Sequence, residues 1–399
     1  MQPTSVLATI TGRDRPGVNA ALFAALAAHD VEVRDVEQVV IRDRLILAVL
    51  FDLRGDPVAL RRSVTRTAQA LGLQSEVTID DDVGASRRPP RGTRTHVIVL
   101  GRPLRPGAFS HIAQRIADIG DNIESVAQLA TEPASSVEMI VRTTDPVELR
   151  AVLVQAADDT GVDIAVEQAG LRRRAKRLVV LDIDSTLIRD DAIDLLAERA
   201  GVSDQVVAIT ERAMAGQLEF SESLRTRVAL LAGLPLAEVE AVRDTLRLTP
   251  GARMFVRTLR RLGYQVGVVS GGFTVFADRF VAELGLDFAA ANELEIVDGR
   301  VTGNVVGPII DRAGKAEALE RFATQFGVPL AQTVAVGEGA NDIDMLEAAG
   351  LGIAFNAKSA LRAAADTSVN LPFLDTVLFV LGISREEIDE ADEAGEPPG

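Results

Sequence analysis

Two carboxylates placed two residues apart offer the clearest chemistry in this sequence. Asp182 and Asp184 directly follow the apolar run Leu178–Leu181. Such a run predicts a buried parallel strand, and an extended chain points residues i and i+2 to one face. Open α/β sheets bind their ligands at the carboxyl ends of such strands. An Asp-x-Asp pair also occurs in solvated loops, so the pattern gains its specificity from this strand and from the helix expected near residue 192.

The elements that must position further reactive groups come later in the chain. Apolar runs at 265–269 and 333–336 predict two more short buried strands, and residues 316–326 predict a helix. From the residues alone, Gly271-Gly272 is a weak turn signal, and a lone lysine at a helix start, such as Lys315, would more often lie at the surface. Polar residues that follow these strands or open the helix include Ser270, Lys315, Glu338, Asn341 and Asp342.

The motif LDIDSTLI resembles the first motif of the haloacid-dehalogenase-like phosphohydrolases, and its DxDST form resembles the phosphoserine phosphatases. This resemblance implies that Asp182 attacks phosphorus and that Asp184 is the general acid and base. A carboxylate is a competent nucleophile once Mg²⁺ neutralises the phosphate charge. The second carboxyl would protonate the leaving serine oxygen and then activate the water that splits the aspartyl-phosphate.

The same resemblance assigns expected roles to the later residues. Ser270 and Gly271 match the family's second motif, and Lys315 matches the phosphate-binding lysine of the third. Asn341 matches a position in the substrate pocket. The implied cofactor is Mg²⁺, and the carboxylates implied to surround it are Asp182, Asp184, Glu338 and Asp342.

Residues 190–248 read as mostly helical and lie between the first strand and the rest of the predicted sheet. In the resembled family such an insertion is a cap that closes over the substrate and excludes water. Met214 and Phe220 match residues that shape the pocket, and Arg227 matches an arginine that binds the substrate carboxylate. From the residues alone, Met214 and Phe220 fit core packing equally well, and Arg227 would more often lie at the surface.

Two positions depart from the family pattern. Asp191 stands where the family usually has the glutamate that pairs with the substrate ammonium, so either the cap sits closer or substrate binding is weaker. Glu338 stands where the family has a metal-binding aspartate. A longer side chain on the same backbone predicts looser alignment of the metal.

The first 170 residues contain one strand and helix order twice, βαββαβ, which is ferredoxin-like. The loops before the first helix of each copy match, with Pro16-Gly17 in one and Pro106-Gly107 in the other. Both copies resemble ACT domains, which bind amino acids at subunit interfaces. The resemblance implies L-serine or a related amino acid as effector at Gly17 and Gly107, and a homodimer formed through these modules. The alternative is that the loops are only turns and the modules only dimerise.

Composition limits the remaining classes of function. The 399 residues include no cysteine, which excludes disulfides and thiol catalysis, and the net charge of −16 argues against nucleic acid as a partner. No apolar run reaches the roughly 18 residues of a membrane span. The three histidines all lie at or before His111, so the DxDST half must work with carboxylates. A cytoplasmic enzyme without a membrane partner is therefore expected.

The predicted fold class is α/β: a Rossmann-like doubly wound parallel sheet with a helical cap, preceded by two ferredoxin-like ACT domains. The predicted segments are the first module 1–82, a linker 83–94, the second module 95–170, the phosphatase 171–385 and an acidic tail 386–399 without ordered structure. The predicted substrate is O-phospho-L-serine. Two alternatives stay open: a phosphatase for another small phosphoester, and an amino-acid-sensing regulatory protein whose phosphatase activity is weakened, as Glu338 would allow.

Overall fold

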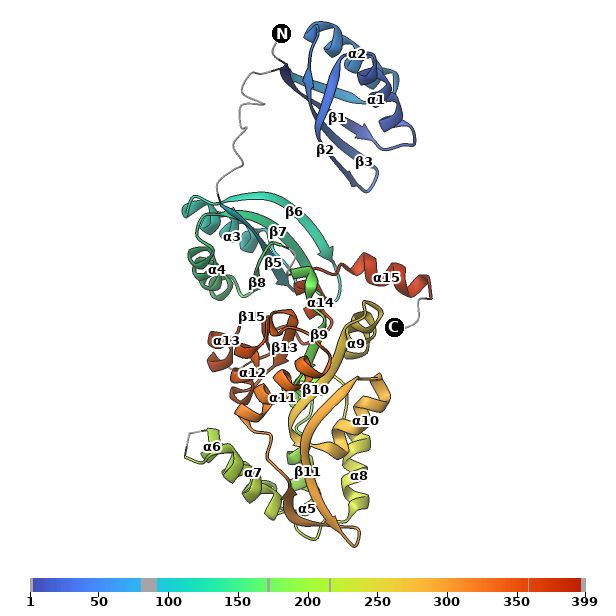
Figure 1. Cartoon of the computed structure of the whole chain (residues 1–399). Helices are drawn as coiled ribbons and strands as arrows, with labels where there is room; N and C mark the ends of the chain where they lie inside the picture. Colours follow the sequence, from blue (N-terminus) through green and yellow to red (C-terminus); the bar gives the residue numbers. More distant parts are fainter. Residues whose placement is uncertain (1–2, 80–91, 171–172, 215–216, 358, 396–399) are drawn as a thin grey trace. The chain divides into compact units, whose positions relative to one another are not determined.

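The computed structural model describes residues 3–79, 92–170, 173–214, 217–357 and 359–395 (Figure 1). The predicted linker lies largely outside these residues. The chain divides into two compact units, residues 1–91 and residues 92–399, and each is described by itself. Within the described residues, no helix is both long enough and apolar enough to cross a membrane.

The first unit is a four-stranded antiparallel sheet in the order β2-β3-β1-β4. Its core depends on alternation in the central strand β3, where Leu45, Leu47, Val49 and Phe51 are buried and their neighbours are more exposed. The elements are β1 (Thr4–Arg13), α1 (Val18–Ala27), β2 (Val31–Ile41), β3 (Arg44–Leu53), α2 (Pro57–Ala70) and β4 (Gln74–Ile79). This is the predicted βαββαβ order.

The second module repeats this topology with the sheet order β6-β7-β5-β8, which confirms the predicted duplication. Its elements are β5 (Thr93–Gly101), α3 (Pro106–Asp118), β6 (Asn122–Ala130), β7 (Ser135–Thr143), α4 (Pro146–Thr160) and β8 (Asp163–Gln168). The two glycine loops differ, however. Gly17 precedes α1 in a left-handed conformation (φ 93°), whereas Gly107 is already the second residue of α3. Of the two glycines in the matching Pro-Gly pairs, Gly17 alone has a backbone conformation that favours glycine.

The second module shares a core with the phosphatase segment. Ile98, Leu100 and Ala165 belong to the same hydrophobic cluster as the central strand of the phosphatase sheet. The buried carboxylate of Asp163 accepts hydrogen bonds from the backbone N–H (2.7 Å) and the side-chain amide (2.6 Å) of Asn370. This module is thus joined to the phosphatase by packing as well as by sequence.

The phosphatase sheet has seven strands in the order β12-β11-β10-β9-β13-β14-β15, with β9 at its centre. The strands from β11 to β15 across the sheet are parallel, and β12 pairs antiparallel at the edge. The strands are β9 (Leu178–Leu181), β10 (Gln265–Phe273), β11 (Phe288–Val297), β12 (Arg300–Val306), β13 (Thr333–Gly337), β14 (Gly352–Phe355) and β15 (Thr367–Val369). The predicted Asp298-Gly299 turn joins β11 to β12, with φ of 51° and 72°.

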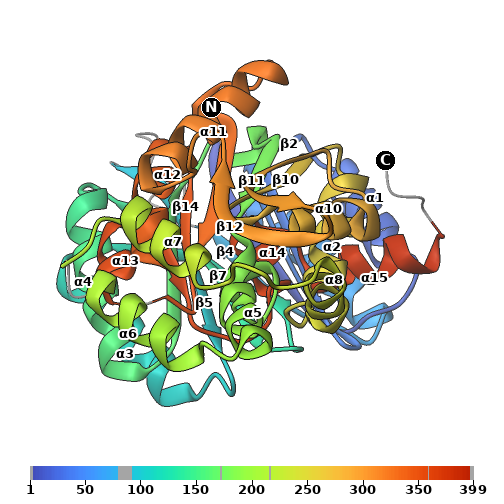
Figure 2. The ribbon, with the colours of Figure 1, turned by 90° about the horizontal axis from the view of Figure 1, so that it is seen from below.

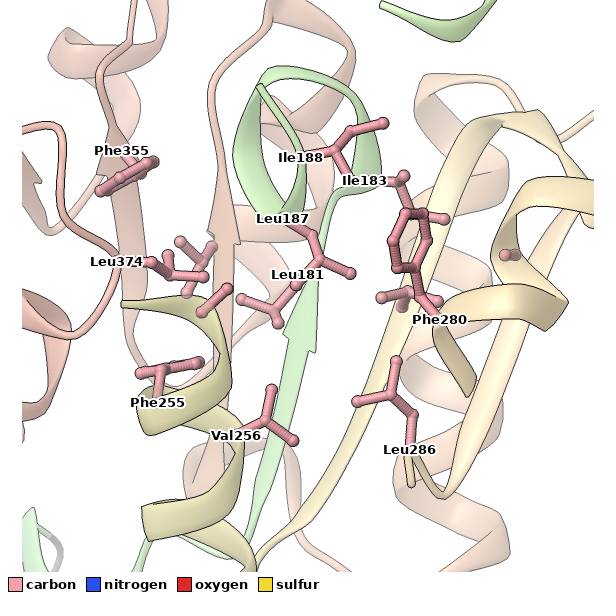
Figure 3. Packing of buried hydrophobic residues seen from close by; sticks show 14 of the residues in the cluster. Leu181, Ile183, Leu187, Ile188, Phe255, Val256, Phe280, Leu286, Phe355 and Leu374 are labelled. Atoms are coloured by element: carbon pink, nitrogen blue, oxygen red, sulfur yellow. The ribbon is translucent and has the colours of Figure 1, made fainter. Parts of the chain in front are cut away.

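Both faces of this sheet are covered, as expected for a doubly wound fold. Along β9, Val179 and Leu181 belong to one hydrophobic cluster, and Leu178 and Val180 belong to another. Figure 3 shows Leu181 within the first of these clusters. The surrounding helices are α9 (Ala252–Arg261), α10 (Thr274–Leu284), α11 (Arg312–Gln325), α12 (Ile343–Ala348), α13 (Ser359–Ala364) and α14 (Thr376–Val380).

Four helices form the predicted cap: α5 (Ala192–Ala200), α6 (Ser203–Met214), α7 (Phe220–Ala229) and α8 (Leu236–Thr245). Figure 2 shows them on its near side, at one end of the sheet. The chain enters and leaves the cap side by side, because Ile188 pairs with Leu248 in an antiparallel bridge. The hydroxyl of Thr249 also donates to the carbonyl of Thr186 (2.7 Å). The base of the cap is therefore bonded to the turn that carries the DxDST motif.

The expectation that residues 386–399 lack ordered structure is wrong for residues 386–395. Residues Arg385–Glu393 form the helix α15, which Ser384 and Glu387 cap reciprocally. Ile388 is 2% exposed within the main core, and Arg257 and Arg261 pair with Asp392. The acidic composition concealed one apolar anchor and complementary arginines on a helix far away in sequence.

Candidate active site

The DxDST motif forms a tight turn at the carboxyl end of β9. The N–H of Asp182 still donates to the carbonyl of Val336 on β13 (2.9 Å), and the turn Ile183–Leu187 closes when the N–H of Leu187 donates back to the carbonyl of Asp182 (3.2 Å). Ile183 and Leu187 are buried and anchor the turn in the core (Figure 3). This anchoring leaves both Asp182 and Asp184 lining a cavity above the sheet.

A buried ammonium group holds the first carboxylate. Lys315 is 0% exposed, and its Nζ lies 2.7 Å from Asp182 Oδ1 and 2.6 Å from Asp342 Oδ1. Burial lowers the pKa of the Lys315 ammonium, but the two carboxylates outweigh this effect and its net pKa is raised. Burial and the Asp342 carboxylate raise the pKa of Asp182, and Lys315 opposes that shift. Lys315 therefore stabilises the ionised form that a nucleophile needs.

Asp342 orders the loop after β13. Its Oδ2 accepts hydrogen bonds from the N–H groups of Glu338 and Gly339, both at 3.0 Å. A Cβ at Gly337 would lie 2.5 Å from the Asp342 carboxyl carbon, so this approach requires glycine. Asp342 does not line the cavity, because its oxygens serve Lys315 and the backbone.

The second carboxylate, Asp184, is fixed from both sides of the cavity. Its Oδ1 accepts from the N–H of Ala192 at the start of the cap (3.0 Å), and its Oδ2 accepts from the hydroxyl of Ser270 on β10 (3.2 Å). A Cβ at Gly272 would lie 2.8 Å from Oδ2. Burial raises the pKa of Asp184, and the bond from Ala192 opposes this only in part. A carboxyl with a raised pKa suits a general acid.

The cavity between cap and sheet has a volume of about 540 Å³. Most predicted site residues line it: Asp182, Asp184, Asp191, Phe220, Arg227, Gly271, Glu338 and Asn341. Ser270 instead donates to Asp184, and Lys315 lies between Asp182 and Asp342. The side chain of Met214 lies outside the described part of the chain.

On the cap side, Asp191 and Arg227 bring opposite charges to the cavity. Asp191 is the N-cap of α5, where its carboxylate accepts from the N–H of Ile193 (3.2 Å). Aspartate is favoured at helix N-caps, so aspartate in place of the family's usual glutamate at position 191 also stabilises the start of α5. Burial raises the pKa of Asp191 to about 7, with a further contribution from Asp184. Burial lowers the pKa of Arg227, while Asp191 opposes that shift.

The donor set in the cavity fits a hard divalent cation. Asp182, Asp184, Glu338 and Asn341 line the same cavity, and their side chains carry oxygen atoms, the ligands that Mg²⁺ prefers. Within the described residues, no three acidic or histidine side chains converge into a complete metal cluster. Mg²⁺ usually keeps several waters and binds through one or two carboxylates together with substrate phosphate, so the fit does not require such a cluster.

Sequence reasoning missed several residues of the cavity wall. Thr210 and Ser223 line it from the cap, and Arg312 lines it from the start of α11, where its Nε donates to Asp344 (2.6 Å). The sequence could have indicated Ser223, because it precedes Arg227 by one helical turn and so lies on the same face of the helix. No comparable signal marked Thr210.

Comparison with known proteins matches the family model of haloacid dehalogenase-like hydrolases over residues 179–347, and two ACT domain models over residues 4–78 and 94–167. A phosphoserine phosphatase from Streptomyces coelicolor is 54% identical over 99% of this chain and 97% of its own length. The chain belongs to the phosphoserine phosphatase family. A second phosphoserine phosphatase, from Mycobacterium tuberculosis, is 53% identical over 97% of this chain and 95% of its own length.

The fold of this chain is similar to those of solved HAD family hydrolases. A HAD family hydrolase from Salmonella enterica aligns with a TM-score of 0.65 at 27% identity, covering 72% of this chain and 98% of that one. A probable phosphoserine phosphatase from Vibrio cholerae aligns with a TM-score of 0.58 at 33% identity, covering 74% of this chain and 88% of that one. The predicted fold class and family are thereby confirmed.

The buried triad of this phosphatase predicts a pH-dependent loss of stability in Lys315→Met. Removing the ammonium leaves Asp182 and Asp342 buried beside each other, which should lower the free energy of unfolding by about 3–5 kcal/mol at neutral pH. Protonation of a carboxyl relieves this repulsion, so the loss should shrink as the pH falls toward about 4. Urea unfolding of parent and variant at several pH values measures the difference.

Lys176→Met is the matched control. Lys176 is also buried, but its Nζ donates to the carbonyls of Gly350 (2.7 Å) and Ala331 (3.2 Å). Its removal should cost stability with a much weaker pH dependence. Equal pH dependence in the two variants would contradict the role assigned to Lys315.

Proposed function

We propose that the protein hydrolyses O-phospho-L-serine to L-serine and phosphate through an aspartyl-phosphate on Asp182. The observation that carries this is a single cavity with two kinds of wall. The sheet side carries Asp182 and Asp184, and the cap side carries the anion Asp191 and the cation Arg227. A phosphate next to the sheet and a zwitterionic amino acid next to the cap match that distribution of charge.

The residues of the chain divide the chemistry between them. Asp182 attacks phosphorus, and the ion pair with Lys315 keeps it ionised. Asp184, positioned by Ala192 and Ser270, gives its proton to the serine oxygen as that oxygen leaves. The same carboxylate then removes a proton from the water that hydrolyses the aspartyl-phosphate. The cap keeps other water away until the phosphoenzyme has formed.

Mg²⁺ is proposed as the cofactor. Asp182, Asp184 and Glu338 are the cavity carboxylates that would hold it, with Asp342 as the second acidic residue of the same loop. When bound, the ion supplies the charge neutralisation that lets a carboxylate approach a phosphate dianion. A cytoplasmic location and the absence of nucleic-acid and membrane partners stay predictions.

Asp182→Asn is expected to abolish turnover, because a neutral amide is a poor nucleophile. Phosphate release from O-phospho-L-serine should fall below about a hundredth of the parent rate. Asp184→Asn should lose turnover but keep substrate binding, measurable by calorimetry. Asp278→Asn, an exposed substitution on α10, is the control. Phosphate release from Asp182→Asn above that limit would overturn the proposed mechanism.

Glu338→Asp tests the departure in the loop after β13. Glu338 lines the cavity and stands on a backbone fixed by Asp342, so a side chain one methylene too long must fold back, move the metal toward the substrate, or bind through water. Misplacement near 1 Å can reduce a rate about a hundredfold. We expect Glu338→Asp to lower the Mg²⁺ concentration for half-activity and to raise kcat/KM about tenfold or more.

Metal titrations with phosphoserine measure both quantities, and Glu347→Asp on the exposed side of α12 is the matched control. An unchanged or poorer Glu338→Asp enzyme would show that the loop already seats the glutamate correctly. Phosphate release too slow to detect in the parent protein would instead favour the amino-acid-sensing alternative.

Regulation is proposed to act through the first module, with L-serine or a related amino acid bound at the Gly17 loop and a homodimer formed through the modules. The left-handed backbone of Gly17 and the free space around it support a ligand loop there. Gly107, inside α3, is a weaker candidate. Because the second module shares the phosphatase core, a test should remove residues 1–91 and keep the unit 92–399.

Deletion of residues 1–91 is expected to abolish inhibition by L-serine at concentrations below product inhibition. Gly17→Val should do the same, since a side chain at φ 93° forces the loop to rearrange. Gly72→Val carries the same kind of strain (φ 65°) in the turn before β4 and is the control. Inhibition curves measure the response, and a full serine response in the truncated enzyme would exclude the first module as the sensor.

A further inference from the structure

Three buried polar atoms on the cap side of the cavity have no hydrogen-bond partner within the described part of the protein. Among the described residues, the hydroxyls of Thr210 and Ser223 and the Nε of Arg227 are buried and make no hydrogen bond. All three residues line the same cavity. A buried donor left unpaired destabilises the folded state, so such atoms call for an explanation. A ligand with acceptor oxygens would supply the missing partners.

Ser223 differs from its neighbour on the same helix. The hydroxyl of Thr226 donates to the carbonyl of Glu222 (2.7 Å), which is the usual local bond for such a residue within a helix. Ser223 has the corresponding carbonyl of Glu219 available, but only its backbone N–H bonds to it (2.9 Å). The side chain is 1% exposed, so water does not pair with it freely either. The helix thus keeps one buried hydroxyl unpaired where it borders the cavity.

The position of Ser223 connects it with Arg227. Residues four apart lie on the same face of a helix, so the hydroxyl and the guanidinium border the cavity together. A carboxylate has about four lone-pair positions that can accept hydrogen bonds. One edge of a guanidinium group does not occupy all of them. Asp191, which would receive the ammonium, is the competing anion next to Arg227. A hydroxyl adds a donor for the carboxylate without adding another charge to the subsite.

We propose that Ser223 completes, with Arg227, the subsite for the α-carboxylate of the substrate, and that Thr210 is a further donor beside it. This inference rests on the proposed function and makes it more specific. A phosphoester without a carboxylate leaves these buried donors unpaired in the closed complex. Sites built around such donors reject analogues that lack the matching group. The subsite therefore selects phosphorylated α-amino acids.

The test compares two substrates that differ in the carboxylate alone. O-Phospho-L-serine carries it, whereas O-phosphoethanolamine keeps the phosphate and the ammonium but lacks it. In the full-length protein, Ser223→Ala should lower kcat/KM for phosphoserine about ten- to a hundredfold, the usual effect of losing a hydrogen bond to a charged group. Phosphoethanolamine turnover should change by less than about twofold. Thr226→Ala, on the same helix, should leave both substrates unaffected.

Stability gives a second readout. If the Ser223 hydroxyl stabilised the fold, its removal in Ser223→Ala would lower the unfolding temperature. An unpaired hydroxyl kept for a ligand should leave that temperature unchanged or raise it by a few degrees in Ser223→Ala, because the variant loses an unsatisfied donor and gains a better helix former. Added phosphoserine should then protect the parent protein against heat more than it protects the variant.

Each outcome bears on one claim. Equal losses for both substrates, or a lower unfolding temperature, assign Ser223 a structural role and overturn the inference. Unchanged phosphoserine kinetics in Ser223→Ala overturn it while leaving the proposed function intact. A parent enzyme that releases no phosphate from phosphoserine, with Mg²⁺ present, overturns the proposed function and this inference together.

Discussion

The buried ammonium of Lys315 is the interaction on which the rest of the site depends. It lies between Asp182 on β9 and Asp342 after β13, and it is completely excluded from water. Two carboxylates without it could not both stay ionised at this depth. The arrangement also joins Asp182 to the loop that carries Glu338, because Asp342 holds that loop through two backbone N–H groups.

The cap is bonded to the same turn that carries Asp182 and Asp184. Asp184 accepts a hydrogen bond from Ala192 at the start of α5, and Thr249 at the end of the cap donates to Thr186. A displacement of the cap would therefore move Asp184, the proposed general acid. Enzymes of this kind gain from such a connection, since protonation of the leaving group is useful only when the cavity is closed.

The second ACT module packs against the phosphatase core, whereas the first is a separate compact unit. Its sheet contributes Ile98, Leu100 and Ala165 to the phosphatase core, and Arg173 on the connecting segment pairs with both Glu138 and Glu167 of the module. The first module is a compact unit of its own. Duplication thus produced two copies with one topology, of which one became part of the catalytic body. The sensing role proposed for the first copy rests instead on the left-handed, open loop at Gly17.

The sequence alone determined what local pattern and motif spacing can carry. The apolar runs predicted the strands, the duplicated βαββαβ order predicted the two modules, and DxDST with its later motifs predicted which side chains meet at the end of β9. The resemblance to the family's motifs named these side chains, and parallel strands bring their carboxyl ends to one edge, which is why residues far apart in the sequence meet there. Most of the predicted residues do line the cavity.

Only the tertiary structure decided how those side chains are used. Burial and pairing between distant segments assigned Lys315 to two carboxylates, made Ser270 a support for Asp184, and left the hydroxyl of Ser223 without a partner. The same distant pairing ordered the acidic terminus, because Ile388 reaches the core and Asp392 reaches two arginines of α9. Local composition determines neither the pairing within the site nor the order of the terminus. The free energies of both arise from contacts that exist only once the chain has folded.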